Sequence, residues 1–222
     1  MVKQERAART RDTLVRAAAE VFAEEGFGTA SISAISKRAG VSTGGLHFHF
    51  GSKGALAEAV AERASEKLRA ITVSRRSGGD VLQVLIDSSH DLMALLERDP
   101  VVSAGFGLSA GGGVAPAAVR AGGAGWDLRT QWQRWVEATF RAADREGLLA
   151  DGVSPQAAAA AVVAAMVGFG VLGAGGFPRV GPSSLTRYWA LMLPRLAAPG
   201  SLDELEPGGS GAPRGPVARR SS

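Results

Sequence analysis

The sequence predicts an all-α fold. Apolar residues recur at spacings of three and four over several long segments, which is the period of a helix with one buried face. No segment shows the convincing alternation of apolar and polar residues that a half-buried strand requires. Clusters of glycine, proline and serine separate the helical segments, as expected of connecting turns.

Two short helical segments near the N-terminus are separated by a glycine. Ser31 can cap the first segment, and Gly40 can end it because glycine adopts the left-handed conformation of such a turn. Ser42 can cap the second segment, in which Leu46 and Phe50 share an inward face. This is the layout of a helix-turn-helix, whose second helix enters the major groove of DNA.

The outward side of the second segment carries the residues that we expect to contact DNA. Gly44 and Gly45 let the backbone come close to the duplex. Lys53 lies in the first turn of the next helix, where the helix dipole does not favour a cation, so we expect a DNA phosphate as its partner. The predicted DNA-binding residues are Arg11, Ser31, Ser33, Ser42, Thr43, Gly44, Gly45, His47, Phe48, His49 and Lys53.

The run AGVSTGGLHFHFGSKGAL, from Ala39 to Leu56, resembles the signature of the TetR family of transcriptional regulators. The opening KQERAARTRDTLVRAAAEVFAEEGF is also similar to the γ-butyrolactone receptor branch of that family, which controls antibiotic production in actinomycetes. The resemblance is strong over roughly the first quarter of the chain and weaker beyond it. It implies a homodimeric repressor that binds a palindromic operator in double-stranded DNA and is released by a small-molecule effector.

The charge of the chain is unevenly spread. Residues 1–76 hold 13 Lys and Arg against 8 Asp and Glu, which suits phosphate binding. A merely solvated surface would explain this charge equally well if it stood alone. The chain has no cysteine, which fits a reducing cytoplasm, and its N-terminus lacks the apolar stretch of a signal peptide. We therefore expect a cytoplasmic, nucleoid-associated protein.

The periodicity also predicts the order of the elements. Helices are expected at 4–25, 53–74, 81–97, 126–146, 155–174 and 183–196, with one short helix and a mobile loop in the Gly- and Ala-rich segment 103–125. The predicted domains are a DNA-binding domain at 1–52, a connecting helix at 53–76, a ligand-binding and dimerisation domain at 77–198, and a disordered tail at 199–222.

The family resemblance implies that the second domain encloses the effector and forms the dimer. Trp132 falls where butyrolactone receptors carry a ligand-contacting tryptophan, and its indole offers a large face and one N–H donor; a structural core tryptophan is the alternative. The predicted ligand-binding residues are Trp132, Met93, Phe106, Ala165, Met166 and Phe169. The predicted dimer interface is a four-helix arrangement of 155–174 and 183–196, with an apolar seam of Leu185, Trp189, Met192 and Leu196.

Three residues depart from the receptor branch. Thr43 replaces a common lysine, His47 a common tyrosine, and Ala165 a ligand-binding threonine. Loss of that hydroxyl removes a polar anchor from the pocket. The departures resemble the pseudo-receptors, which respond to antibiotics or their intermediates, so both ligand classes stay open.

Two other motifs match the letters of a catalytic or cofactor-binding signature without the surroundings that the signature requires. GLSAG at 107–111 matches the nucleophile elbow of a hydrolase with Ser109 as nucleophile, but all three histidines precede it. Gly168, Gly170 and Gly173 match a dinucleotide fingerprint without the strand that it needs, and small residues for close helix packing are the better interpretation. We predict no enzyme activity and no cofactor; a DNA-binding dimer without an effector remains an alternative.

Two further features match part of the pattern of a metal site or of a membrane span. His47 and His49 lie on nearly opposite faces of a helix and cannot bind one metal ion together, so no metal is predicted. Residues 157–177 are uncharged and long enough to span a bilayer. They are mostly alanine and glycine, and we predict a buried interface helix and no membrane association.

Overall fold

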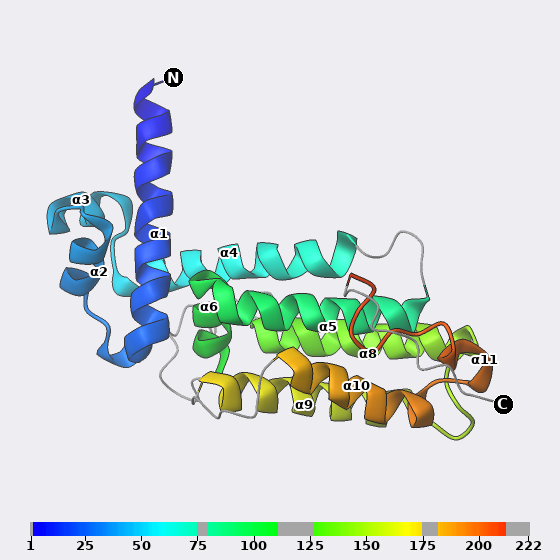
Figure 1. Ribbon diagram of the computed structural model, residues 1–222. Helices are drawn as coiled ribbons and strands as arrows, with labels where there is room; N and C mark the ends of the chain where they lie inside the picture. The colour runs from blue at the N-terminus through cyan, green and yellow to red at the C-terminus, as the bar shows by residue number, and fades with distance from the viewer. Residues whose placement is uncertain (1, 75–79, 111–126, 175–181, 212–222) are drawn as a thin grey trace. The chain divides into compact units, whose positions relative to one another are not determined.

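The computed structural model describes residues 2–74, 80–110, 127–174 and 182–211 (Figure 1). Its helices are α1 (Val2–Thr29), α2 (Ile32–Ala39), α3 (Thr43–His49), α4 (Lys53–Ser74), α5 (Val81–Arg98), α6 (Pro100–Ala110), α8 (Leu128–Arg145), α9 (Pro155–Ala174), α10 (Pro182–Leu196) and α11 (Pro199–Leu202). Within these residues the β pairing is confined to an isolated bridge between Leu149 and Ala197. The predicted all-α fold is confirmed.

The chain divides into two compact units. The first comprises Met1–Ser74 and Ala94–Trp135, and the second comprises Arg75–Met93 and Val136–Ser222. Helix α6, which the sequence assigned to the second domain, therefore belongs with α1 and α4 in the first unit. The predicted domain limits follow the order of the chain and remain a prediction.

The core of the first unit is built from the apolar stripes that the sequence indicated. Leu14 and Ala18 of α1 are fully buried, as are Leu56 and Val60 of α4. Fully burying one leucine stabilises a fold by about 1.5–3 kcal/mol, so these stripes fix α1 against its neighbours. At the end of α1, Gly26 leaves the helical conformation (φ 76°, ψ 156°), although helical turns continue to Thr29.

The short helix predicted within 103–125 is confirmed as α6, which includes residues 103–110 of that segment. Ser109 lies inside this helix, where its hydroxyl donates to the Gly105 carbonyl (3.0 Å) and accepts from the Leu128 N–H (3.1 Å). Those contacts tie α6 to the start of α8, and none of the described residues before Ser109 forms a strand. Ser109 therefore lacks the strand-to-helix turn of a nucleophile elbow, and its hydroxyl has a structural role. Residues 111–126 lie outside the described residues.

The predicted disordered tail is wrong for residues 199–211. After α11, the segment Glu206–Ser210, which we call the C-terminal strap, lies along α5 in the second unit. Asp87 accepts from both the N–H (2.7 Å) and the hydroxyl (2.6 Å) of Ser210. The His90 ring hydrogen-bonds the Pro207 carbonyl at 2.9 Å, and Gln83 accepts from the Glu206 N–H at 2.7 Å. Polar composition suggested disorder, but these backbone groups have specific partners on α5.

Helix α9 is the one described helix that is long and apolar enough to cross a membrane, by length and composition alone. Only 22% of the apolar window Pro155–Gly173 is buried inside the structure. Alanine is the commonest of its exposed residues, as at Ala157, Ala161 and Ala164. Small side chains on an exposed helix face permit close approach of a second helix.

One close contact gives a test of the first unit. A side chain added at Gly105 of α6 would meet the Ala64 Cβ of α4 at 2.6 Å and a Leu128 methyl at 3.1 Å. Gly105→Ala is therefore expected to lower the free energy of unfolding by about 1–3 kcal/mol through overpacking. Gly107→Ala is the matched control, because nothing lies within 4 Å of its added Cβ. In urea denaturation the control should instead be stabilised by about 0.5–1 kcal/mol. Equal midpoints for the two variants would contradict the contact.

Candidate nucleic-acid interface

The two helices α2 and α3 begin at the residues that the sequence predicted. The Ser31 hydroxyl accepts from the Ala34 N–H at 3.1 Å, and the Ser42 hydroxyl accepts from the Gly45 N–H at 3.1 Å. Gly40 ends α2 in the left-handed conformation (φ 65°, ψ 27°). Both N-caps and the turn glycine are confirmed, and together they set the angle at which α3 leaves α2.

Helix α3 has one buried and one exposed side, as predicted. Leu46 is fully buried and Phe50 nearly so. Thr43 and His47 are exposed, and Phe48 is 84% exposed. Among the exposed large apolar side chains of the described residues, the Phe48 ring is the most open to water.

The two glycines of α3 differ. Nothing lies within 4 Å of a Cβ added at Gly44, so the protein itself does not require glycine there. A Cβ at Gly45 would approach a Val41 methyl to 2.9 Å. Gly45 therefore serves the packing of the turn, whereas only Gly44 fits the predicted close approach of another molecule.

The predicted phosphate contact of Lys53 is corrected by its surroundings. The ammonium donates to the carbonyls of Ala30 (2.7 Å), Phe27 (2.8 Å) and Gly28 (3.3 Å). It also lies 4.6 Å from the centre of the Phe27 ring. An ammonium has three donors, and all three are occupied here. Lys53 thus caps the C-terminal end of α1, where the helix dipole favours a cation, and joins it to the start of α4.

A second link joins α1 to α2 and was not foreseen from the sequence. Arg38 donates to both carboxylate oxygens of Glu24 (2.7 and 2.9 Å) and approaches Glu20 at 3.5 Å. The hydrogen bonds from Arg38 hold the pKa of the Glu24 carboxyl below its ordinary value. A bidentate guanidinium–carboxylate pair fixes geometry as well as charge. The pair holds α2, and with it α3, against α1.

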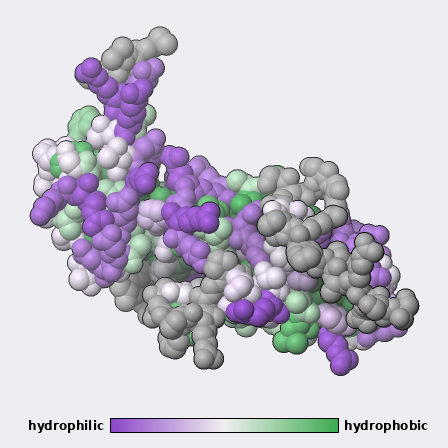
Figure 2. Space-filling model, viewed as in Figure 1, coloured by the Kyte–Doolittle hydropathy of each residue, from purple (hydrophilic) through white to green (hydrophobic). Residues whose placement is uncertain are grey.

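Basic residues extend this surface along α1. Arg6, Arg9 and Arg11 are exposed on a helix instead of a frayed arm, and the first turns of α1 extend beyond α2 and α3 (Figure 1). Hydrophilic residues gather over this part of α1 (Figure 2). The Arg11 guanidinium stacks 5.2 Å from the centre of the Phe50 ring, which anchors it beside the end of α3.

The predicted ligand-binding residues are split between the units. Trp132 is 2% exposed and stacks on Trp135 with ring centres 5.0 Å apart, and its indole N–H has no hydrogen-bond partner among the described residues. Phe106 and Trp132 belong to the first unit, whereas Met93, Ala165, Met166 and Phe169 belong to the second. That they line one pocket therefore remains a prediction.

The predicted dimer seam on α10 is wrong. Leu185, Trp189 and Leu196 are buried within the second unit, so they cannot meet a partner chain, and Met192 is half-buried. The opposite face of α10 carries Leu191, which is 75% exposed. The spacing of the apolar residues identified a buried face correctly but could not tell whether the core or a second copy buries it.

Comparison with known proteins decides the family. Residues 14–60 match the family described as bacterial regulatory proteins, tetR family. The A-factor receptor protein of Streptomyces griseus is 31% identical over 213 residues, which cover 94% of this chain and 71% of the relative. The chain belongs to the TetR family. This is a family of regulators and not of enzymes, and the predicted resemblance is confirmed.

Solved structures of TetR proteins share the fold. A γ-butyrolactone receptor described as ArpA-like superposes with a TM-score of 0.76 at 24% identity, over 90% of this chain and 94% of the other. CprB from Streptomyces coelicolor, solved in complex with its biological operator sequence, superposes with a TM-score of 0.71 at 25% identity, again over 90% and 94%.

The capping role of Lys53 can be tested by removing its charge. Lys53→Met keeps the length of the side chain but leaves three carbonyls without their donor, so the free energy of unfolding should fall by about 2 kcal/mol or more. Lys37→Met, at an exposed position of α2, is the control and should change stability by less than about 0.5 kcal/mol. Urea denaturation measures both. A loss of DNA affinity in Lys53→Met at unchanged stability would instead restore the phosphate contact.

Proposed function

We propose that this TetR-family chain is a homodimeric repressor that binds a palindromic operator and is released by a small-molecule effector. The observation that carries the proposal is the exposed side of α3, with Thr43, Gly44, His47 and Phe48 pointing away from a firmly capped helix-turn-helix. The relative CprB was solved on its operator, which supports DNA as the ligand of this surface.

Helix α3 lies in the major groove in this proposal. The Phe48 ring suits apolar contact with thymine methyl groups, and His47 reaches a base edge or phosphate. Gly44 leaves the backbone open to the duplex, while Ser31 and Ser33 contact flanking phosphates together with Arg6, Arg9 and Arg11 of α1. Base contacts then supply specificity and phosphate contacts supply affinity.

Dimerisation uses the exposed faces of α9 and α10. Ala157, Ala161, Ala164 and Val171 form an exposed stripe on α9, and α10 adds Leu191. Pairing this stripe with that of a second copy buries an apolar helix that is otherwise largely exposed. A two-fold dimer also matches the symmetry of a palindromic operator.

Trp132 is the proposed anchor for the effector. A buried indole N–H without a partner costs free energy, and an acceptor oxygen on a ligand would satisfy it. A γ-butyrolactone and an oxygen-bearing antibiotic or intermediate both offer such an acceptor, in keeping with a role in antibiotic control. The effector releases DNA by binding more tightly to a state in which the two α3 helices are wrongly spaced.

A DNA-binding dimer without an effector is the second candidate. It is favoured only by the replacement of the receptors' threonine with Ala165. A ligand-induced rise in melting temperature separates the two, because ligand bound to the native state stabilises it.

DNA binding through α3 is tested by selecting genomic fragments with the purified protein and measuring affinity for the enriched palindrome. Phe48→Ala should weaken that affinity about tenfold, the cost of one lost base contact, without changing the melting temperature. Val73→Ala, which truncates an apolar side chain 61% exposed on α4, is the matched control and should bind as the wild type does. Absence of any enriched sequence at physiological salt would argue against the repressor.

The effector site is tested with Trp132→Phe, which keeps an aromatic ring and removes the N–H. Operator affinity should be unchanged, while the ligand concentration that releases DNA should rise about tenfold for one lost hydrogen bond in a buried site. Trp189→Phe is the control, since Trp189 is equally buried and its N–H also lacks a partner among the described residues. If only the control loses its response, Trp132 is not the anchor.

A further inference from the structure

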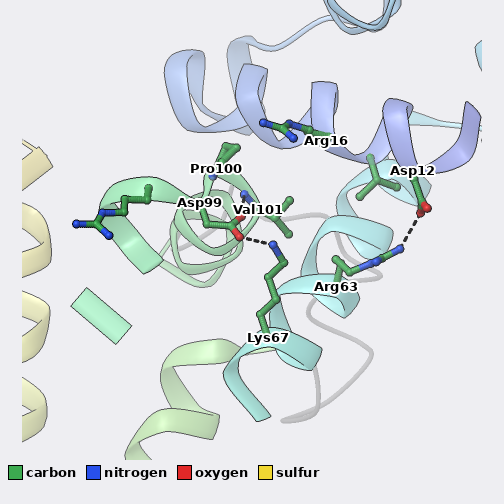
Figure 3. A pocket seen from close by; sticks show the side chains of 9 residues that line it. Asp12, Arg16, Arg63, Lys67, Asp99, Pro100 and Val101 are labelled. Carbon is green, nitrogen blue, oxygen red and sulfur yellow. Dashed lines mark hydrogen bonds and ion pairs between the residues drawn. The ribbon is translucent and has the colours of Figure 1, made fainter. Parts of the chain in front are cut away.

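A cavity of about 270 Å³ lies within the first unit, and none of the residues that line it belongs to α3 (Figure 3). Its walls come from the middle of α1, the middle of α4 and the junction between α5 and α6. Six of its nine lining residues are charged: Asp12, Arg16, Arg63, Lys67, Arg98 and Asp99. None of the roles proposed above uses this cavity.

The two carboxylates of the cavity are already paired. Arg63 donates to Asp12 at 2.7 Å, and Lys67 donates to Asp99 (Figure 3). Burial by itself raises the pKa of Asp99, but hydrogen bonds from Lys67 and from the Val101 N–H outweigh it and hold that pKa below its ordinary value. The negative charges of the lining are therefore neutralised within it.

Two guanidinium groups remain without a carboxylate partner in the lining. Among the described residues Arg98 forms no ion pair. Arg16 pairs at 3.2 Å with Glu20, which lies one turn further along α1 and outside the cavity. The pair is exposed to solvent, so it holds Arg16 only weakly. Four cations against two carboxylates leave the lining with two excess positive charges, and outside it Arg63 also approaches the exposed carboxylate of Glu66 at 3.6 Å.

We propose that this cavity binds a small phosphate monoester. Such a group carries a charge of about −1.5 to −2 at neutral pH, which matches the excess of the lining. The planar guanidinium groups of Arg16 and Arg98 suit bidentate hydrogen bonding to phosphate oxygens. The volume is slightly below the roughly 300–1,000 Å³ of sites for drug-sized ligands, which restricts the ester to a few carbons. Val15 and Val101 supply apolar wall for those carbons.

The position of the cavity gives the ligand a route to influence the DNA-reading helices. Arg16 lies on α1, which holds α2 through Glu24 and Arg38, and Arg63 and Lys67 lie on α4, which follows α3. A phosphate held between Arg16 and Arg98 ties these elements together. The site is a second effector site in a unit that the proposed anchor Trp132 also occupies.

Calorimetric titration of the full chain without DNA tests the site, with glycerol 3-phosphate and inorganic phosphate as separate probes and sodium chloride at matched ionic strength as the blank. Binding of one equivalent per chain is expected for at least one probe. Binding of the ester alone assigns the site to phosphorylated metabolites, and binding of both assigns it to the phosphoryl group itself. Because the titration involves no DNA, its outcome does not depend on whether the proposed repressor function is correct.

Variants decide where the probe binds. Arg98→Gln and Arg16→Gln should each weaken binding about tenfold, the loss expected for charge-assisted hydrogen bonds to one guanidinium. Arg69→Gln, which removes an exposed charge from α4 outside the cavity, should bind as the wild type does. Arg98→Lys keeps the charge but loses the planar pair of N–H donors, and it should give an intermediate affinity. No binding of either probe, or equal weakening in Arg69→Gln, would overturn the proposal.

Discussion

The position of the helix-turn-helix formed by α2 and α3 depends on the contacts of the Lys53 ammonium group. Its three hydrogen bonds close the C-terminal end of α1 and fix the start of α4 in one step. Helices α2 and α3 lie between those two points in the chain, so their position is set at both ends. Short helices of seven and eight residues are not stable alone in water, and this framework supplies the missing stabilisation.

Local signals in the sequence predicted the helix-turn-helix well. The N-caps at Ser31 and Ser42, the left-handed Gly40 and the inward pair Leu46 and Phe50 all depend on neighbours within a few residues. Lys53 could not be predicted in the same way, because its partners lie 23 to 26 residues earlier in the chain. The helix dipole of α4 does not favour a cation at Lys53, as expected, but the partners of the ammonium are neutral carbonyl oxygens at the C-terminal end of α1 and not the expected anion.

In the second unit, the spacing of apolar residues could not predict which surface buries a helix face. Periodicity on α10 identified Leu185 and Trp189 as members of one buried face, but the same pattern describes a face buried in the core and a face buried by a partner. On α9 the uniform alanine and glycine content hides the distinction altogether, and only the exposure of individual side chains identifies the outward stripe. The proposed ligand pocket cannot be derived from either kind of signal, because it requires side chains from elements far apart in the chain to lie together.

The C-terminal strap limits how this chain can be shortened. Asp87 is only 6% exposed, and two of its hydrogen bonds come from Ser210. The segment after α10 is rich in Pro and Gly, which makes it an obvious place to end a shortened chain. Ending the chain there would remove those donors from a buried carboxylate and expose α5 to water. A protease that cuts within residues 199–205 would have the same effect as such a truncation. Affinity tags and fluorescent fusions therefore belong after the C-terminal strap, which ends at Ser210.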